Sequence, residues 1–328
     1  MEEIAAAPRP SRSPAEHTAA LRRDSRAVLV VNTRSRRAGR LHGHLPRLLG
    51  EQGVDLLADL PVTEPGTLEA TLAAALAHDP DLLVLGGGDG TVATAVDLLA
   101  HTDVALGLLP LGTTNNVARS LGLPLTAGAA VRVLAHGRVT EVDLGRVAGA
   151  HGVDLFANLA SVGLSAQVAH RVPHRLKRWL GRGAYPLTAL RVLPTHQPFR
   201  ATVTSEQGTV EFWTHQLNIA NGRSYAGRAI ARDATIDDGL LVVYRLGGRA
   251  RSKLSEAAVE QVLLGPHRDL AMTPFLVVPE VRVETDPPLG VDVDGEVHGV
   301  TPVTVGCAPG ALRVLLPGAV AGAGPRGG

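Results

Sequence analysis

A short run of glycines carrying one carboxylate and one hydroxyl is the segment of this chain best suited to chemistry. It reads Gly86-Gly87-Gly88-Asp89-Gly90-Thr91 and follows residues 81–85, which are apolar except for Asp81. Glycine lets a ligand approach the backbone closely, and the first amides of a helix have no partner within the helix, so such a run favours phosphate binding. The alternative is a tight strand-to-helix turn that binds nothing, which the pattern by itself leaves open.

Two common nucleotide motifs do not fit this run. The dinucleotide fingerprint needs a glycine at its sixth position, where this chain has Thr91. A Gly-Lys-Ser/Thr phosphate loop is excluded because the only lysines, Lys177 and Lys253, do not follow glycines. Asp89 is the informative residue, because a carboxylate beside phosphates needs a cation, a hydroxyl or a helix dipole to offset the repulsion.

A second glycine loop, Pro110 to Asn116, follows the next apolar run along the chain. Gly112 offers an open backbone and Thr113 a hydroxyl, while Asn115 and Asn116 could bond a nucleotide or cap the following helix. Open α/β sheets bind ligands beyond the carboxyl ends of their strands, and both loops are predicted at such ends. Two such loops side by side favour a phosphate site over a bare turn.

The elements that would position these loops alternate between strand and helix. Continuous apolar runs predict strands, and apolar residues at helical spacing predict helices between them. The predicted strands are 27–32, 54–60, 81–85 and 104–109, and the predicted helices are 41–52, 66–78, 91–100, 115–121 and 127–136. This alternation predicts a parallel sheet with helices on both faces.

After about residue 140 the pattern changes to short runs rich in valine and leucine, separated by Gly, Pro and Asp-Gly. Such runs are typical of an antiparallel sandwich, although 172–193 keeps helical spacing. We therefore predict an α/β nucleotide-binding domain followed by a mainly antiparallel β-sandwich domain. The expected division is a disordered leader (1–26), the α/β domain (27–137), the β-rich domain (138–317) and a disordered tail (318–328).

Composition excludes several classes of protein. The net charge of +1 is too balanced for nucleic-acid binding through bulk electrostatics. Cys307 is the single cysteine, so no intrachain disulfide can form, which fits a reducing compartment. No apolar run approaches the ~20 residues of a membrane-spanning helix. Residues 1–26 lack the apolar centre of a secretory signal, and we expect a cytoplasmic protein.

The two loops together resemble the catalytic-domain family of diacylglycerol kinases, which includes bacterial soluble lipid kinases and the sphingosine and ceramide kinases. The motifs are GGGDGT and, in the second loop, PLGTTNNVARSLGLP. Later landmarks also match, namely FANLASVGLSAQ, NIANGRSYAG, ATIDDGLLVV and VDVDGE. GGDGT alone is shared with NAD kinases and 6-phosphofructokinases, but the ordered set is more specific. The resemblance implies ATP-dependent phosphorylation of a lipid hydroxyl, with diacylglycerol as the expected acceptor.

The resemblance also implies a nucleotide site, and a magnesium ion is expected to accompany ATP there. Asp89 is carried over both as a catalytic residue and as part of this site. The chain departs from the family at three places. The family usually has Asn-Pro where this chain has Asn32-Thr33, often has Asn-Glu where it has Ala93-Thr94, and in many members has aspartate where it has Asn116. The residues expected to contact ATP are Asn32, Thr63, Gly87, Gly88, Asp89, Gly90, Thr91, Gly112, Thr113 and Asn116.

Two alternatives stay open. The departures at Ala93-Thr94 and Asn116 leave room for a catalytically weak module that binds a nucleotide or a lipid. The same glycine loop could also serve a kinase of the same fold that phosphorylates a soluble acceptor such as NAD.

The segment from Val291 to Glu296 alternates apolar and polar residues and then reaches Asp294-Gly295, a favoured centre for a hairpin. A plain hairpin is therefore the interpretation from the residues alone. The resemblance implies in addition that this segment faces the phosphates and that Glu296 accepts the proton of the lipid hydroxyl. Asp294 would support Glu296 or act as the base in its place. A carboxylate within hydrogen-bond reach can orient a hydroxyl and take its proton.

A second acidic turn, Asp237-Asp238-Gly239, offers the hard oxygens that magnesium prefers. A solvated turn is the alternative. The resemblance implies a structural magnesium ion held by the Asp238 carboxylate and by the main-chain oxygens of Thr235 and Leu240.

A basic stretch interrupts the predicted β-rich domain, since no acidic residue occurs from Leu155 through Ser205. Residues 171–191 have the spacing of a basic amphipathic helix that carries Trp179, which suits the surface of an anionic bilayer. A helix packed on the sandwich with a solvated charged face fits equally well. We expect ATP and a membrane lipid as partners, with peripheral membrane contact through this helix, and we leave a homodimer open.

Overall fold

The computed structural model describes residues 12–150, 152–171, 188, 191–192, 195–221, 224–225, 228–229, 237–248 and 274–318. The chain divides into two units. Unit 1 consists of Met1–Gly112, Leu121–Val142 and Ala311–Gly328, and unit 2 of Thr113–Ser120 and Asp143–Gly310.

Unit 1 is built on a parallel sheet in the order β2-β1-β3-β4-β18. Its strands are β1 (Ala27–Asn32), β2 (Leu56–Val62), β3 (Leu82–Gly87), β4 (Ala105–Pro110) and the last residues of β18 (Val303–Leu316). Every residue of β3 and β4 is buried, as expected for strands covered on both faces. The predicted parallel α/β domain is confirmed.

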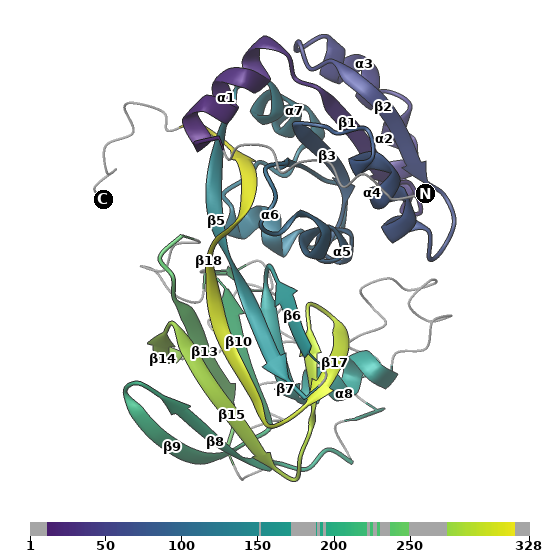
Figure 1. The fold of residues 1–328 in the computed structure, drawn as a ribbon. Coiled ribbons are helices and arrows are strands. Elements are labelled where there is room, and N and C mark those ends of the chain that lie inside the picture. The colour runs from purple at the N-terminus through teal and green to yellow at the C-terminus, as the bar shows by residue number, and fades with distance from the viewer. Residues whose placement is uncertain are drawn as a thin grey trace, which may run out of the picture. The chain divides into compact units, whose positions relative to one another are not determined.

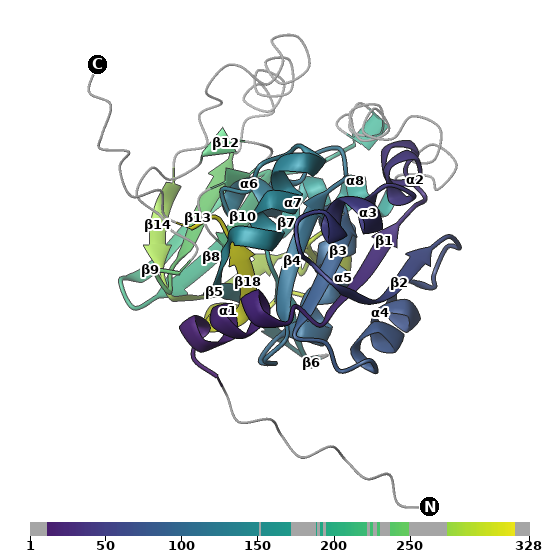
Figure 2. The same ribbon diagram turned by 90° about the horizontal axis from the view of Figure 1, so that it is seen from above.

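Helices cover both faces of this sheet (Figures 1 and 2). On one face lie α2 (Arg36–His42), α3 (Leu45–Gly50) and α7 (Ala127–His136), and on the other lie α4 (Leu68–Leu76) and α5 (Asp89–Leu99). The buried cluster between α3, α7 and the sheet consists of Ala, Leu and Val side chains. This aliphatic packing agrees with an aromatic content of only 3%.

One further helix, α1 (Pro14–Arg23), precedes β1 and belongs to unit 1. Ser13 and Glu16 form a reciprocal capping box at its start, and Pro14 occupies the first helical turn. The prediction that residues 1–26 form a disordered leader is therefore wrong for residues 12–26. Residues 1–11 lie outside the described residues.

Long-range contacts hold α1 in place. His17 is buried, and its Nε2 lies 3.0 Å from the main-chain oxygen of Asp81. The Val139 amide donates to the Thr18 hydroxyl at 2.9 Å. Arg313 of β18 is also buried, and its Nη2 donates to the Arg12 carbonyl at 2.6 Å. Residues at both ends of the chain thus fix the helix.

The docking of α1 should depend on pH through His17. Burial lowers the pKa of His17 below its ordinary value of 6.5, and Arg313 and Arg12 act in the same direction, although the bond to the Asp81 carbonyl opposes them. Below pH 6.5 the unfolded chain binds this proton more readily than the folded one, so stability should fall as the pH is lowered through that value.

Urea unfolding of the wild type and of His17→Gln at pH 7.5 and pH 5.5 measures this effect. The glutamine keeps an amide donor for the Asp81 carbonyl but does not titrate. We expect the wild type to lose more stability than the variant on acidification. Equal losses of stability in the two proteins would show that His17 binds its proton equally well in the folded and the unfolded chain.

Unit 2 is mainly antiparallel β, as predicted. One sheet has the order β14-β13-β10-β7-β16-β17, and a second set of strands pairs in the order β18-β15-β8-β9. Strands β5 and β6 form a hairpin, and β11 and β12 form a two-stranded sheet. The strand bounds are β5 (Arg138–Gly149), β6 (Gly152–Phe156), β7 (Leu159–Gly163), β8 (Phe199–Ser205), β9 (Gly208–Thr214), β10 (Gln216–Asn221), β11 (Ser224–Tyr225), β12 (Arg228–Ala229), β13 (Leu241–Leu246), β14 (Pro274–Val278), β15 (Glu280–Asp286), β16 (Gly290–Val293) and β17 (Glu296–Val300).

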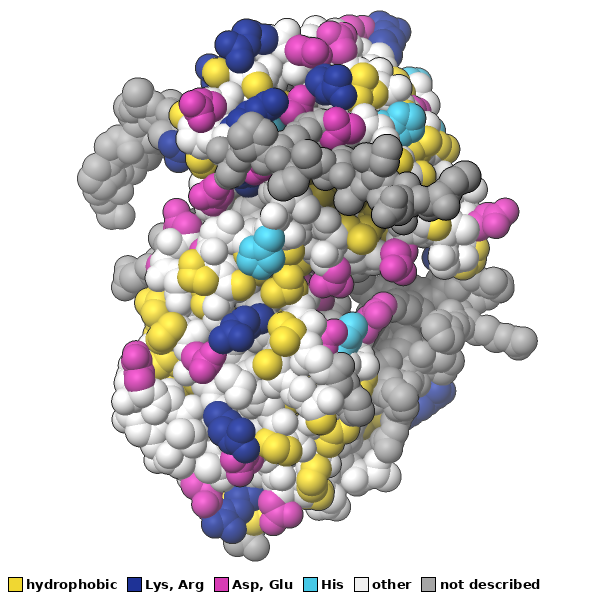
Figure 3. All heavy atoms as spheres, viewed as in Figure 1, with side chains coloured by type: hydrophobic (Ala, Val, Ile, Leu, Met, Phe, Trp, Pro, Cys, Tyr) yellow, Lys and Arg dark blue, Asp and Glu magenta, His cyan; other side chains and the backbone are white. Residues whose placement is uncertain are grey.

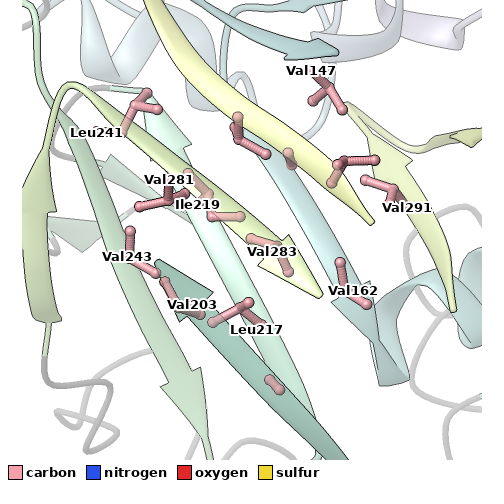
Figure 4. Packing of buried hydrophobic residues seen from close by; sticks show 14 of the residues in the cluster. Val147, Val162, Val203, Leu217, Ile219, Leu241, Val243, Val281, Val283 and Val291 are labelled. Atoms are coloured by element: carbon pink, nitrogen blue, oxygen red, sulfur yellow. The ribbon is translucent and has the colours of Figure 1, made fainter. Parts of the chain in front are cut away.

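Alternate residues of these strands point inward and form one core. Figure 4 shows Val162, Leu217 and Ile219 from one set of strands beside Val203 and Val283 from the other. Two short helices accompany the sheets, α6 (Asn116–Ser120) and α8 (Leu164–Arg171). Helix α8 contacts β7, β16 and β17.

The division of the chain differs from the predicted boundaries at 137 and 317. Residues 138–142 and 311–316 belong to unit 1, and residues 113–120 belong to unit 2. The reason lies in β18, whose Val314 pairs parallel to Leu106 of β4 and whose earlier residues pair antiparallel to β15. The predicted tail from 318 lies almost entirely outside the described residues.

The surface agrees with the balanced composition. Figure 3 shows acidic and basic side chains interspersed on the face that it presents. None of the helices in the described ranges has the length and apolarity needed to cross a bilayer.

Candidate functional site

The predicted phosphate loop is the junction between β3 and α5. Strand β3 ends at Gly87, Gly88 is the N-cap, and α5 begins at Asp89. A Cβ added at Gly87 would lie 2.5 Å from the Thr91 hydroxyl oxygen, so the turn requires glycine there. Asp89 lies in the first turn of α5, where the helix dipole stabilises a carboxylate.

The second glycine loop touches the first within unit 1. The amides of Leu111 and Gly112 both donate to the Gly87 carbonyl, each at 2.9 Å. A Cβ added at Gly88 would lie 3.1 Å from the Gly112 Cα, so the backbones approach as closely as glycine allows. The structure therefore brings together two segments that the sequence placed at neighbouring strand ends.

Two more of the predicted nucleotide residues lie at this edge of the sheet. The Asn32 side-chain amide, at the end of β1, donates to the Thr91 hydroxyl at 3.2 Å. Thr63 follows β2, whose last residue, Val62, is paired with Asn32 in parallel register. The carboxyl ends of β1, β2, β3 and β4 thus carry all the predicted nucleotide residues of unit 1.

Thr113 and Asn116 belong to unit 2. Asn115 has a positive φ of 52°, and its carbonyl accepts the Arg119 amide, so it ends the loop directly before α6. The side-chain oxygen of Asn116 is buried and has no hydrogen-bond partner in the described part of the chain. A buried acceptor without a partner suits a donor from a ligand.

The Asp-Gly-Glu segment forms the tight hairpin between β16 and β17. Val293 pairs with Glu296, and both residues between them have positive φ, 49° for Asp294 and 103° for Gly295. This is the geometry that two-residue hairpins favour, so the hairpin predicted at Asp294-Gly295 is confirmed. The hairpin leaves the Glu296 side chain 85% exposed at the start of β17.

Asp294 is held quite differently from Glu296. One of its carboxylate oxygens accepts the Ala157 amide at 2.9 Å, and the other accepts the Leu159 amide at 2.8 Å. Its own amide donates to the Leu159 carbonyl at 2.9 Å. These bonds hold the hairpin against the loop between β6 and β7. Both carboxylate oxygens of Asp294 therefore accept backbone amides, whereas the Glu296 side chain is exposed.

The acidic turn is described from Asp237 onward, and Thr235 lies outside the described residues. Gly239 has a φ of 72°, and Asp238 Oδ1 accepts the Leu240 amide at 3.0 Å. The Asp238 carboxylate and the Leu240 carbonyl are hard oxygen donors of the kind that magnesium takes. Among the described residues no three His, Cys, Asp or Glu side chains are placed to hold a metal ion, so such a site would depend on main-chain oxygens.

The sequence interpretation missed Asp143, a buried residue of β5 that holds this turn. Its two carboxylate oxygens accept the amides of Gly239 at 2.7 Å and Gly310 at 2.8 Å. Burial raises the pKa of the nearby Cys307 thiol to about 12, and the Asp143 charge acts in the same direction. This environment disfavours the thiolate form of Cys307.

The basic helix predicted over residues 171–191 lies almost entirely outside the described residues. Its start coincides with the end of α8 at Arg171. Its contact with a membrane therefore stays a prediction.

Comparison with known proteins identifies two conserved domains in the chain. The family described as diacylglycerol kinase catalytic domain matches residues 26–147. The family described as YegS C-terminal NAD kinase beta sandwich-like domain matches residues 158–316. The two matches together contain both glycine loops, the acidic turn and the Asp-Gly-Glu hairpin.

Relatives are similar to the chain over most of their own length. "Probable lipid kinase YegS-like" from Xanthomonas euvesicatoria pv. vesicatoria is 32% identical over 288 residues, covering 82% of this chain and 89% of the relative. "Diacylglycerol kinase" from Mycobacterium tuberculosis is 32% identical over 284 residues, covering 84% and 89%. A crystal structure of a diacylglycerol kinase from Bacillus anthracis str. Sterne matches with a TM-score of 0.69 at 22% identity, covering 90% of this chain and 98% of that chain, and shows the same fold.

Proposed function

Because this chain belongs to the diacylglycerol kinase catalytic-domain family of lipid kinases, we propose that it transfers the γ-phosphate of ATP to the hydroxyl of diacylglycerol, giving phosphatidic acid. The kinase activity of the family implies the use of ATP. Diacylglycerol is favoured as the acceptor because the Mycobacterium tuberculosis relative carries that name.

The contact between the two glycine loops carries the nucleotide part of the proposal. Gly87, Gly88 and Gly112 keep side chains away from the carboxyl ends of β3 and β4, which leaves backbone amides and the α5 dipole for phosphate oxygens. Asn32 and Thr63 would line the same pocket. Thr113 and Asn116 are proposed as further nucleotide-binding residues.

We assign the chemistry to the Asp-Gly-Glu hairpin. The exposed Glu296 carboxylate would accept the hydroxyl proton as the lipid oxygen bonds to the γ-phosphorus and the bond to the ADP oxygen breaks. Asp294 supports it by anchoring the hairpin, because both of its oxygens accept backbone amides. Asp89 would help to orient the phosphates and their accompanying cation.

Magnesium would have two places in this scheme. One ion would accompany the ATP phosphates, near Asp89, and would neutralise part of their charge. A structural ion would be held by the Asp238 carboxylate and the carbonyls of Thr235 and Leu240. The Asp143 carboxylate holds this turn in place by accepting the Gly239 amide.

We also propose that the protein is cytoplasmic and docks on membranes through the basic segment 171–191, because its lipid acceptor stays in the bilayer. A homodimer is compatible with this arrangement.

A labelled-ATP assay tests the function. The purified protein would be given mixed micelles of diacylglycerol, ceramide, sphingosine or monoacylglycerol and, separately, NAD. We expect label in phosphatidic acid, its loss in Asp89→Asn, and none in NAD. NAD is included because the unit 2 match is described as NAD kinase-like. Label in NAD, or in no acceptor despite ATP binding, would overturn the proposal.

A further inference from the structure

We propose that His298 is a positioning residue for Glu296, and that Asp154, His298 and Glu296 form a relay which removes the proton of the lipid hydroxyl. This inference rests on the proposed function, since it takes Glu296 as the base. His298 Nδ1 lies 2.9 Å from Asp154 Oδ1 of β6, and His298 Nε2 lies 3.8 Å from Glu296 Oε2. All three residues belong to unit 2.

The backbone of β17 explains why this side chain leaves the regular pattern. Asp292 pairs with Val297 and Val291 pairs with Gly299, so His298 is an extra residue without a partner in the β16–β17 register. An extra residue of this kind is a β-bulge, and bulges redirect a side chain and occur often beside active sites. Here the bulge places the imidazole beside β6, where its Nδ1 contacts Asp154 Oδ1.

The bond to Asp154 sets the tautomer of the imidazole. An ionised carboxylate only accepts hydrogen bonds, so the 2.9 Å contact requires the proton on Nδ1. In the neutral ring Nε2 then carries the lone pair, and Nε2 is the atom nearer Glu296. The same logic orients the histidine of other carboxylate–histidine pairs.

The imidazole of His298 has two acidic neighbours among the described residues. Asp154 from β6 and Glu296 from β17 are the described charged groups within ion-pair distance of it. Asp292 of β16 is engaged with the Gly295 amide at 2.8 Å. Helix α8, which also contacts β17, has no acidic or basic residue from Leu164 through Ala169.

The distance of 3.8 Å between Nε2 and Glu296 Oε2 is too long for a hydrogen bond, and the contact becomes an ion pair only when the imidazole is protonated. Glu296 is 85% exposed, so rotation of its side chain can bring Oε2 within bonding distance of Nε2. Catalytic hydrogen bonds are often long in the absence of substrate.

Each proton and each bond in this relay is accounted for by a named group. The lipid O–H bond breaks and its proton passes to the Glu296 carboxylate, while the lipid oxygen bonds to the γ-phosphorus and the bond from that phosphorus to the ADP oxygen breaks. Glu296 then passes the proton to His298 Nε2, and Asp154 balances the charge of the imidazolium. The ring is 34% exposed, so it can release the proton to water and leave Glu296 ready for the next turnover.

Steady-state kinetics of four variants test this relay. We expect His298→Ala to lower kcat about tenfold, less than a missing general base would, with the KM for ATP unchanged. Exogenous imidazole should restore part of the rate in His298→Ala but not in His298→Gln or Glu296→Gln. Glu284→Gln is the matched control, because it removes an exposed ion pair, with Arg282, on β15.

The double variant Glu296→Gln/His298→Ala separates the relay from a general loss of stability. If His298 acts through Glu296, the double variant should be no slower than Glu296→Gln alone. Wild-type kcat in His298→Ala and in His298→Gln, or full additivity in the double variant, would overturn the relay while leaving Glu296 as the base. Full activity of Glu296→Gln would instead remove the premise in the proposed function.

Discussion

Replacing Glu296 by glutamine is expected to lower kcat by about 10²–10⁴-fold, the usual contribution of a general base, while the KM for ATP stays close to that of the wild type. The glutamine has nearly the same shape but cannot accept the hydroxyl proton. Because the side chain is 85% exposed, the substitution should not affect folding. Labelled-ATP kinetics on diacylglycerol micelles, with thermal unfolding of both proteins, measure the two quantities.

Asp294→Ala is the informative comparison for that variant. Removing this carboxylate leaves the Ala157 and Leu159 amides without their acceptors, which costs about 1–3 kcal/mol for each buried group. We therefore expect a lower unfolding temperature together with lost activity. An Asp294→Ala protein as stable as the wild type but inactive would move the base from Glu296 to Asp294.

Substituting Gly87 by alanine is expected to weaken ATP binding by more than about tenfold, since small displacements of positioning groups have effects of this size. The added methyl group would lie 2.5 Å from the Thr91 hydroxyl oxygen, so the start of α5 has to shift. Overpacking of this kind also costs about 1–3 kcal/mol of stability. Calorimetric titration with ATP and thermal unfolding measure the two effects.

Gly90→Ala provides the matched control within the same loop. A Cβ added at Gly90 meets no atom within 4 Å, and alanine favours a helix over glycine, so the unfolding temperature should stay the same or rise slightly. If the phosphates lie over the loop, the same methyl group should still reduce ATP affinity. Wild-type affinity in Gly87→Ala would show that this turn does not bind the nucleotide.

Much of the fold could be predicted from the sequence because its signals are local. The apolar runs before both glycine loops are buried strands, and the helix after Asp89 follows from its spacing. Recognition of the lipid kinase family is confirmed by the two domain matches. The contact between Gly88 and Gly112 followed from parallel strand order, because neighbouring parallel strands end at the same edge.

Helix α1 shows where local reasoning failed. Its Ser-Pro-Ala-Glu start carries a readable capping signal, but few apolar residues follow it. The helix is instead stabilised by polar contacts with Asp81 and Arg313, which are distant in the sequence. The composition of residues 1–26, rich in proline and arginine, therefore suggested disorder, because the contacts that order residues 12–23 come from distant parts of the chain.

The candidate site shows the same limit. Asp154 and His298 are separated by 144 positions, and no spacing rule connects them. The bulge that redirects His298 depends on the pairing register of β16 and β17, which the alternating pattern of Val291 to Glu296 does not reveal. Asp143 was missed for a similar reason, since its partners Gly239 and Gly310 come from two distant turns.

Strand β18 gives biosynthesis a constraint of its own. Its first residues pair with β15 and its last residues complete the sheet of unit 1 beside β4. During translation, most of unit 1 therefore emerges first, but its parallel sheet lacks the fifth strand until unit 2 has left the ribosome. Nascent chains arrested before residue 311 should expose an unpaired edge at β4, where chaperones can bind.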